Sequence, residues 1–233
     1  MTLANNHILA FGQDAMLDTL VHLDKYKVGE TGAGKNSNEA FRPYVQTVKN
    51  QKIAILGVSR VLSSPSWYAG TNSPGAASAH TPEPMLGAIK KSAKENDYTI
   101  VYIHWNNEFK DYPEPYARNL AKQMIDSGAD IIIGAHSHCL MGIEYYKHKP
   151  IYYSLGNFVF NRSTRGGDKT IHSMLVNFEI SNNKVKSRIT PVRITGGQPN
   201  FMGEAYNKDT IKRMNQLSFN AVIAADGAVS EKL

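Results

Sequence analysis

Three short apolar runs rich in β-branched residues, separated by two amphipathic stretches, constrain the fold of this chain most strongly. The runs lie at residues 51–58, 97–105 and 129–136. Each has the length and composition of a buried strand. Between them, residues 85–93 and 117–125 carry apolar side chains at helical spacing, the second stretch ending before Gly128. Alternating strands and helices are typical of α/β folds with right-handed crossovers, so we predict a layered α/β fold with parallel strands and helices in its first half.

One more helix and a long loop complete the first half of the chain. Apolar side chains recur at helical spacing between Phe11 and Leu23, which predicts an amphipathic helix over residues 11–25. Residues 59–82 are rich in Ser, Gly and Pro and show no periodicity, so we predict a long loop there. In a compact domain a loop of this length more often has a function than serves as a plain connection.

After residue 138 the pattern changes to pairs of apolar runs that are typical of β-hairpins. One pair covers residues 141–155 and is predicted to turn around Lys147 to Pro150. A second covers residues 173–194 and is predicted to turn at Asn182 and Asn183. The second half is therefore expected to be antiparallel. Residues 196–233 form a tail that begins as a loop and contains one amphipathic stretch.

The composition is that of a folded protein with one substantial core. Hydrophobic residues make up 42% and charged residues 20% of the 233 positions, and a chain of this length needs no more than one or two domains. We predict a single domain over residues 1–233. The net charge of +6 comes from scattered Lys and Arg residues. A nucleic-acid-binding protein would concentrate that charge in a stripe interleaved with aromatic residues, so no nucleic-acid partner is expected.

Cysteine usage and apolar runs give little indication of the cellular compartment. Cys139 is the only cysteine, so no internal disulfide can form, and we interpret it as a small packed residue rather than a ligand or nucleophile. No stretch approaches the roughly 20 apolar residues that span a membrane, and the first residues lack the pattern of a signal peptide. We therefore expect neither a membrane span nor a secretion signal in this sequence.

Side chains that can bind metals lie at the ends of two predicted strands. His104 and Glu108 close the strand at residues 97–105, and His136 and His138 close the strand at residues 129–136. Ligands gather beyond the carboxyl ends of parallel strands. In a His-x-His segment both rings point to the same side, and imidazole is a common ligand of divalent transition metals. The three histidines therefore predict a metal site, and these ligand types suit Mn, Zn and Fe alike.

Four ordered motifs give the sequence a family resemblance. The segments "LANNH", "HWNNE", "GADIIIGAHSH" and "YSLGNFVF" resemble those of the CapA family, the bacterial poly-gamma-glutamate capsule biosynthesis proteins, which belong to the calcineurin-like metallophosphoesterase superfamily. The resemblance extends from Leu3 to about Pro191 and also includes the "TGAG" segment at residues 31–34. It implies a metallophosphoesterase-like α/β sandwich.

The resemblance also implies roles for individual residues. Asn6 would be a metal ligand and His7 a general acid near the leaving group, because they match the Asn-His of the superfamily's Gly-Asn-His motif. Three further metal ligands are implied: His104, His136 and His138. Glu108 and Asn157 match positions near the pocket, where they would contact substrate or support the ligands.

Three departures from the family pattern bear on the site. Asn106 stands where the family has glycine, and Ser137 stands where it commonly has proline. Relatives open with a strand that ends in Gly-Asp, and this sequence starts at "MTLANNH" without it. We therefore expect an N-terminally incomplete domain with one weakly held ion rather than a full two-metal centre. We also expect its sheet to lack one strand.

The function implied by the resemblance is capsule poly-gamma-glutamate biosynthesis. A metal-dependent hydrolysis or transfer at an ester, amide or phosphoryl group is the expected chemistry, with His7 protonating the leaving group. The alternative is a non-catalytic subunit that binds or guides the polymer in a membrane synthesis complex, and the missing carboxylates favour it. A generic phosphodiesterase on a small substrate rests on fold analogy alone. The implied partners are the anionic polymer and membrane subunits of capsule synthesis, and the implied location is the membrane or cell surface.

Overall fold

The chain divides into two compact units. The computed structural model describes residues 1–161, 166–181 and 184–232. Unit 1 comprises Met1–Trp105 and Asn119–Ile132, and unit 2 comprises Asn106–Arg118 and Ile133–Leu233. A single domain was predicted from the sequence. That prediction concerns cooperative folding, which the division into units does not test.

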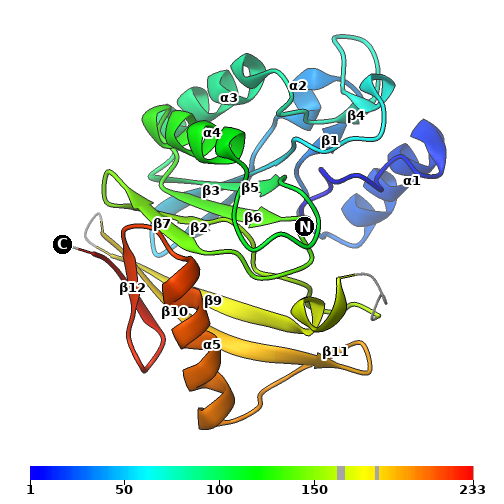
Figure 1. Ribbon diagram of the computed structural model, residues 1–233. Coiled ribbons are helices and arrows are strands. Elements are labelled where there is room, and N and C mark those ends of the chain that lie inside the picture. Colours follow the sequence, from blue (N-terminus) through cyan, green and yellow to red (C-terminus); the bar gives the residue numbers. More distant parts are fainter. Residues whose placement is uncertain (162–165, 182–183, 233) are drawn as a thin grey trace. The chain divides into compact units, whose positions relative to one another are not determined.

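Extended strands form the centre of unit 1 (Figure 1). β3 (Gln51–Ser59) runs parallel to β5 (Tyr98–His104), and their last residues lie opposite each other. β2 (Tyr44–Val48) pairs antiparallel with β3. The last four residues of β3 and most of β5 are buried, which explains why these runs carry β-branched and small apolar residues rather than an alternating pattern. The edge strand β2 is mostly exposed.

Helices pack against these strands. α3 (Pro82–Glu95) contacts β3 and β5 and buries Met85 and Ile89. Two prolines in its first turn are compatible with a helix start, where no intrahelical N–H bond is lost. α1 (Gly12–Lys25) precedes the strands and buries Met16 in a cluster with Leu3 and Leu9.

One helix and one strand are shared between the units. α4 (Pro115–Asp126) has its first four residues in unit 2 and the rest in unit 1. It is followed by Gly128, whose φ of +110° is strained for residues with a side chain. β6 (Ile131–Ala135) has its first two residues in unit 1 and its last three in unit 2.

Short elements complete unit 1. Residues 59–82 were predicted as a loop and are mainly irregular, although they contain two short regular pieces, one of which pairs antiparallel with a segment near residue 33. The short elements are α2 (Ser37–Ala40), the 3₁₀ helix η1 (Pro65–Trp67), β1 (Ala33–Gly34) and β4 (Gly75–Ala76).

Unit 2 is built mainly from antiparallel strands. β9 (His172–Ser181) pairs along its whole length with β10 (Lys184–Thr195), and β10 also pairs with β11 and β13. A second hairpin joins β7 to β8. The remaining strands and the 3₁₀ helix of the unit are β7 (Ile143–Tyr146), β8 (Lys149–Tyr152), η2 (Gly167–Ile171), β11 (Gln198–Asn200), β12 (Ala221–Ile223) and β13 (Ala228–Glu231).

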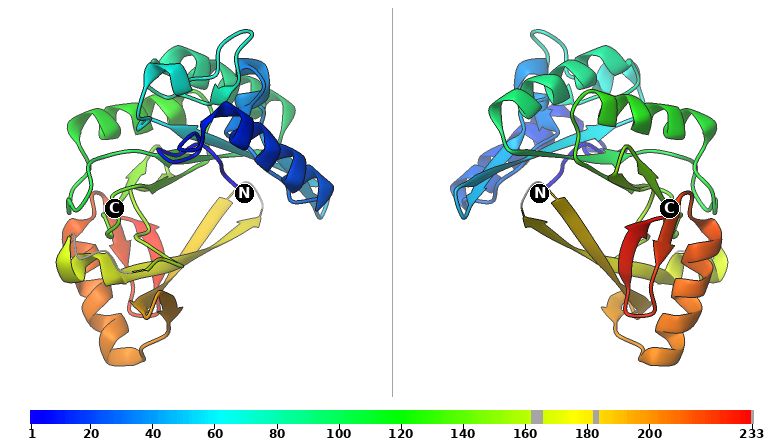
Figure 2. Two further views of the ribbon diagram at one scale, coloured as in Figure 1. Left: turned by 90° about the vertical axis from the view of Figure 1, so that its right-hand side faces the viewer. Right: turned by 90° about the vertical axis from the view of Figure 1, so that its left-hand side faces the viewer.

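The last helix gives unit 2 its own core. α5 (Glu204–Leu217) lies beside β10 and β12, as both views in Figure 2 show. Its apolar face places Ile211, Met214 and Leu217 in a buried cluster with Tyr152 and residues of β7, β9, β10, β12 and β13. The amphipathic stretch predicted in the tail is therefore this helix.

The predicted fold class is confirmed. The chain is mixed α/β, with a parallel pair of strands flanked by helices in unit 1 and antiparallel hairpins in unit 2. The helices predicted at residues 11–25, 85–93 and 117–125 all form, as do the three apolar strands. In the described residues, no helix is both long and apolar enough to cross a membrane.

Three details differ from the prediction. The β7–β8 hairpin turns at Lys147 and His148, both with positive φ, and Lys149 and Pro150 already belong to β8. A two-residue turn of this kind matches the twist of the strands, whereas the pattern alone favoured a longer one. The sequence also gave no sign of β2 or of the short strands in the tail. The predicted turn at residues 182–183 lies outside the described residues, although the β9–β10 pairing confirms the hairpin itself.

Candidate functional site

In unit 1 the structure brings Asn6 and His104 together. His104 is the last residue of β5, and Asn6 lies in the turns that precede α1. The Nε2 atom of His104 and the Oδ1 atom of Asn6 are 2.9 Å apart. The segment that carries Asn6 is fixed by the backbone hydrogen bond from Leu3 N–H to the carbonyl oxygen of Thr31, at 2.8 Å. Two residues 98 positions apart in the sequence are therefore neighbours.

This pair fits a metal ion. Two ligand atoms that bind one ion at right angles, each at about 2.0–2.2 Å, lie about 3 Å from each other. The 2.9 Å between Asn6 Oδ1 and His104 Nε2 matches that separation. The same distance is also that of a hydrogen bond in which Nε2–H donates to the carboxamide oxygen. A bound cation would take the place of that proton.

His7 lies next to this pair in the sequence but is exposed. Its backbone N–H donates to Oδ1 of Asn5 at 2.8 Å, which forms a local turn typical of Asn. The imidazole ring therefore has the access to water that a proton donor needs.

In unit 2, His138 is held in one orientation and one tautomer. Its Nδ1 atom lies 2.8 Å from Oδ1 of Asn157, and Nδ2 of Asn157 donates to the carbonyl oxygen of Thr170 at 3.1 Å. A carbonyl can only accept, so the amide nitrogen of Asn157 faces Thr170 and its oxygen faces the ring. Nδ1 of His138 must therefore carry the proton, which leaves the lone pair on Nε2 available to a ligand.

Aromatic rings enclose His138. Phe109 stacks on it at 5.7 Å between ring centroids, and Phe160 lies at 5.1 Å on a tilted plane. The Nε2 atom of His138 is 3.9 Å from Oε1 of Glu108, and the His136 ring centroid is 6.3 Å away. Unit 2 therefore brings four of the predicted site residues together: Glu108, His136, His138 and Asn157.

Backbone strain is concentrated in the same two loops of unit 2. Four non-glycine residues have positive φ there: Asn106 at 68°, Phe109 at 62°, His136 at 96° and His138 at 61°. Such conformations cost free energy and occur disproportionately at functional sites. Asn106 also explains the departure from the family's glycine, because Asn tolerates the left-handed region better than other residues with side chains.

Hydrogen bonds hold the loop that carries Glu108 against the loop of the histidines. The backbone N–H of Phe109 donates to the carbonyl oxygen of Ser137 at 2.8 Å, and the thiol of Cys139 donates to that of Lys110 at 3.0 Å. Ser137, which replaces the family's proline, donates its hydroxyl to the carbonyl oxygen of Cys139 at 2.8 Å. Burial raises the pKa of the Cys139 thiol, so it is a neutral donor at pH 7. This agrees with its interpretation as a packed residue.

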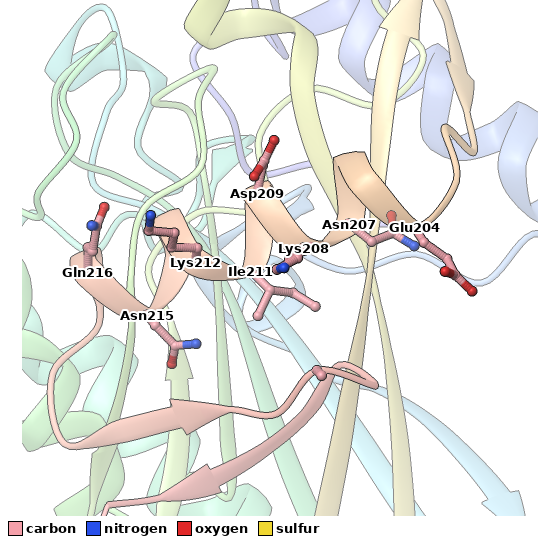
Figure 3. A pocket seen from close by; sticks show the side chains of 9 residues that line it. Glu204, Asn207, Lys208, Asp209, Ile211, Lys212, Asn215 and Gln216 are labelled. Carbon is pink, nitrogen blue, oxygen red and sulfur yellow. The ribbon is translucent and has the colours of Figure 1, made fainter.

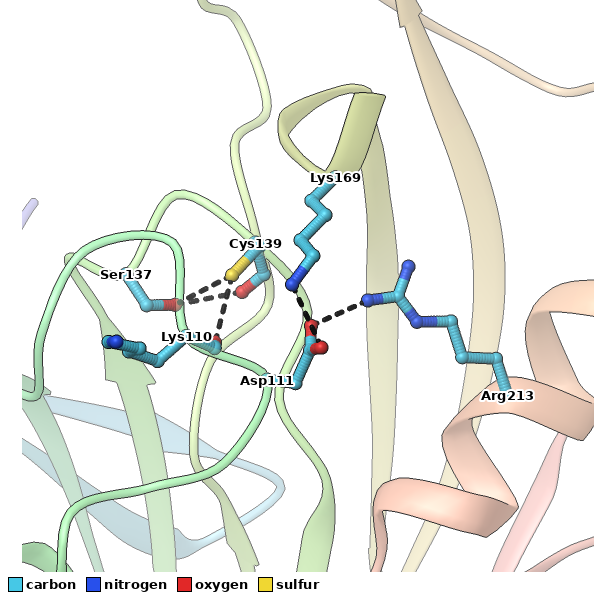
Figure 4. A network of polar contacts seen from close by, with 6 residues as sticks. All are labelled: Lys110, Asp111, Ser137, Cys139, Lys169 and Arg213. Atoms are coloured by element: carbon cyan, nitrogen blue, oxygen red, sulfur yellow. Dashed lines mark hydrogen bonds and ion pairs between the residues drawn. The ribbon is translucent and has the colours of Figure 1, made fainter. Parts of the chain in front are cut away.

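An ion-pair cluster in unit 2 fixes the next residues of the same loop (Figure 4). Asp111 accepts from Lys169 Nζ at 2.9 Å and from Arg213 Nη2 at 2.8 Å. Burial raises the pKa of Asp111, but the hydrogen bonds and charges of the two cations outweigh it, so the pKa lies below its ordinary value. Sequence reasoning missed this cluster, because its members are 58 and 102 residues apart and no motif contains them.

A hollow along α5 contains none of the predicted site residues. It measures about 1120 Å³ and is lined by charges of both signs, Glu204 and Asp209 with Lys208 and Lys212 (Figure 3). It also carries no histidine or cysteine. The chemistry of the histidines, rather than cavity size, therefore identifies the candidate site.

Within the described ranges 1–161, 166–181 and 184–232, no three His, Cys, Asp or Glu side chains cluster closely enough to hold a metal ion. The predicted ligand set differs from such a cluster because it includes the carboxamide of Asn6. Each unit supplies a smaller donor group: the Asn6–His104 pair in unit 1, and His138 with Glu108 and His136 in unit 2. The prediction of a bound metal therefore stays a prediction.

The chain matches one protein family over most of its length. The model of the family described as "Bacterial capsule synthesis protein PGA_cap" matches residues 1–162. This range contains every predicted site residue.

Curated relatives carry related names. The "PGA biosynthesis protein CapA" of Bacillus subtilis (strain 168) is 36% identical over 212 residues, which cover 90% of this chain and 53% of the relative. The "Capsule biosynthesis protein CapA" of Bacillus anthracis is 33% identical over 218 residues, covering 91% and 52%. A "Probable polyglutamine synthesis accessory protein" of Mycobacterium tuberculosis is 29% identical over 208 residues, covering 83% and 55%. The chain thus spans about half the length of the curated relatives it matches.

Proposed function

Because this chain belongs to the bacterial capsule synthesis protein family PGA_cap, we propose that it takes part in the biosynthesis of a poly-gamma-glutamate capsule polymer. The observation that carries the proposal is the 36% identity to a PGA biosynthesis protein over 90% of the chain. The capsule is a surface structure, so we place this role at the cell envelope. The anionic polymer and the membrane subunits that make it are the proposed partners.

We further propose that the chain is catalytic and binds a divalent transition metal. The proposed ligands are Asn6 and His104 in unit 1, and His136 and His138 in unit 2. A bound ion would polarise the oxygen of the reacting ester, amide or phosphoryl group. The 2.9 Å separation of the Asn6 and His104 ligand atoms and the available Nε2 of His138 support this assignment.

The chain's own residues would do the remaining chemistry. His7 is exposed and would donate a proton to the leaving group, exchanging it afterwards with water. Asn157 would keep the proton of His138 on Nδ1, as its contact with Thr170 dictates. Glu108 would contact the substrate or support His138 from 3.9 Å. The stacked ring of Phe109 and the tilted ring of Phe160 would limit the ways in which the His138 ring can turn.

The first test is elemental analysis of the purified chain and three variants. We expect stoichiometric Mn, Zn or Fe in the wild type, and a loss of at least half of it in His104→Ala and His136→Ala. His22→Ala, an exposed histidine on α1, is the matched control and should keep its metal. Hydrolysis of γ-glutamyl amides and of phosphodiesters, measured on the same samples, should fall with metal content. Equal metal in all four proteins would contradict the assignment.

A second candidate function is a non-catalytic subunit that binds or guides the polymer. The lack of a three-residue His, Cys, Asp or Glu cluster among the described residues favours it. The two candidates make opposite predictions for His104→Ala. If the chain only binds the polymer, affinity survives this substitution and no turnover is seen in any variant. If the chain is an enzyme, turnover falls with the metal.

A further inference from the structure

A hollow lies beside the Asp111 ion-pair cluster. It measures about 480 Å³ and lies in unit 2, lined by residues 109–115 and Lys169. Lys169 and Lys110 contribute cations, while Pro113 and Pro115 stiffen the loop that forms the wall. The hollow contains none of the histidines discussed above.

The two cations at the Asp111 cluster are only partly used. Among the described residues, Lys169 and Arg213 make their side-chain hydrogen bonds to Asp111 alone. An ammonium has three donors and a guanidinium five, so most of their donors remain for another anion. Their side chains are 44% and 32% exposed, so such an anion can reach them from solvent.

Asp111 orients both cations without cancelling them. The carboxylate binds each through a different oxygen, so Lys169 and Arg213 converge from two elements, η2 and α5, on one point. Two positive charges, those of Lys169 and Arg213, therefore meet one carboxylate at this cluster. Glu114 also lines the hollow, and its Oε1 atom accepts from the side-chain amide of Asn107 at 2.7 Å. At the Asp111 cluster itself, a second carboxylate from outside would meet a net positive, pre-oriented pair.

We propose that the two cations of the Asp111 cluster, Lys169 at the hollow and Arg213 beside it, bind carboxylate groups of the capsule polymer. The identity of the ligand rests on the proposed function, since a γ-linked glutamate chain bears one free carboxylate per residue. Asp111 follows Glu108 by three residues, so their Cα atoms are at most about 10 Å apart. A polymer held here would therefore pass close to Glu108 and to His138, which Glu108 faces.

The test is binding of a fluorescently labelled, short γ-linked glutamate oligomer, measured by anisotropy at low salt. Lys169→Gln and Arg213→Gln should each weaken affinity about tenfold, the effect of losing one charge-assisted hydrogen bond. Lys169→Arg should restore binding. Lys184→Gln, an exposed lysine of β10, removes the same charge elsewhere and should change affinity less than twofold. The same oligomer with methyl-esterified carboxyl groups should bind to none of the proteins.

Asp111→Asn distinguishes direct binding of the polymer by Lys169 and Arg213 from a structural role of these two residues. If the cations bind the polymer themselves, this variant frees them from a competing carboxylate, and affinity should hold or rise. If Lys169 and Arg213 only hold the loop in place, Asp111→Asn should weaken binding as much as Lys169→Gln and Arg213→Gln do, and the proposal falls. It also falls if Lys169→Gln binds like the wild type while the wild type binds well, an outcome that leaves the proposed function standing. No binding by the wild type would overturn both. Thermal unfolding of each variant confirms that it is folded.

Discussion

At the residue scale, the candidate site depends on a few side chains whose chemistry is fixed by single neighbours. Asn157 is the clearest case, because its contact with Thr170 decides which nitrogen of His138 carries the proton. Replacing Asn157 by Asp would keep the shape but put a charge beside the ring. An aspartate has no N–H for the Thr170 carbonyl, so the second contact would be lost.

We predict that Asn157→Asp stabilises the charged form of the His138 ring, because the imidazolium gains a neighbouring carboxylate. The NMR shifts of the His138 ring nitrogens at one pH would detect this change, with those of His22 as an internal control that should stay the same. Metal content provides a second measurement and should fall at pH 6 more than at pH 8, because the protonated ring cannot bind an ion. Unchanged ring shifts would show that Asn157 does not set the state of the ring.

Asn106 gives a second prediction at this scale. Its φ of 68° suits Asn or Gly, and its Oδ1 atom accepts from the backbone N–H of Glu114 at 2.9 Å. Asn106→Ala should therefore lower the free energy of unfolding by about 2 kcal/mol, through backbone strain and the lost hydrogen bond. Asn106→Gly loses the same hydrogen bond and the same buried amide Nδ2, which has no partner among the described residues, but it adopts this φ without strain, so it should cost about 1 kcal/mol less than Asn106→Ala. Chemical denaturation of both variants checks the order; equal losses would rule out backbone strain as the cause.

At the scale of elements, ion pairs connect the loop after β5 to η2 and α5 within unit 2. Asp111 is the common partner, and its pKa is lowered in the folded chain. A carboxyl group with a depressed pKa stabilises the fold above its unfolded pKa, which for Asp is about 3.9. The contribution is lost as the pH falls below that value and through the folded pKa.

Acid unfolding should therefore distinguish Asp111→Asn from the wild type. We expect the wild type to lose stability more steeply than the variant as the pH falls from 5 to 3, because the variant has no charge to lose at this position. At pH 7 the wild type should be the more stable of the two. Denaturant midpoints measured at several pH values provide the comparison, and added salt should narrow the gap, because the cluster is partly exposed. Parallel pH curves would mean that the ion pairs add nothing to stability.

At the scale of the whole molecule, each unit has its own buried side chains. Ile89 of α3 is fully buried in unit 1, and Met214 of α5 is fully buried in unit 2. Truncating a buried side chain of this size to alanine costs about 2–5 kcal/mol. The two positions can therefore report separately on the stability of the two units.

Ile89→Ala and Met214→Ala test the prediction of a single domain. If residues 1–233 fold as one cooperative domain, both substitutions should lower the midpoint of one shared unfolding transition. Calorimetry with the wild type as reference would show this directly. Two transitions, each lowered by only one of the substitutions, would mean that the units unfold independently and would replace the single-domain prediction.

Local patterns were enough to predict the strands β3, β5 and β6 and the helices α1, α3 and α4. A strand buried on both faces needs a continuous apolar run, and a helix that packs on one side needs an apolar stripe. Both patterns can be recognised within a short stretch of sequence. The hairpins of unit 2 were recognised for the same reason. The exposed edge strand β2 has no buried face to leave a pattern, which explains why it was missed.

The sequence also suggested the candidate ligands, because His136 and His138 lie two positions apart in one short motif. The sequence alone could not show that Asn6 meets His104 across 98 residues, or that Asn157 fixes the proton of His138. It also gave no sign of the Asp111 cluster or of the rings around His138. These contacts join residues far apart in the chain, so tertiary structure decides them. A local pattern records only which face of its own element is buried.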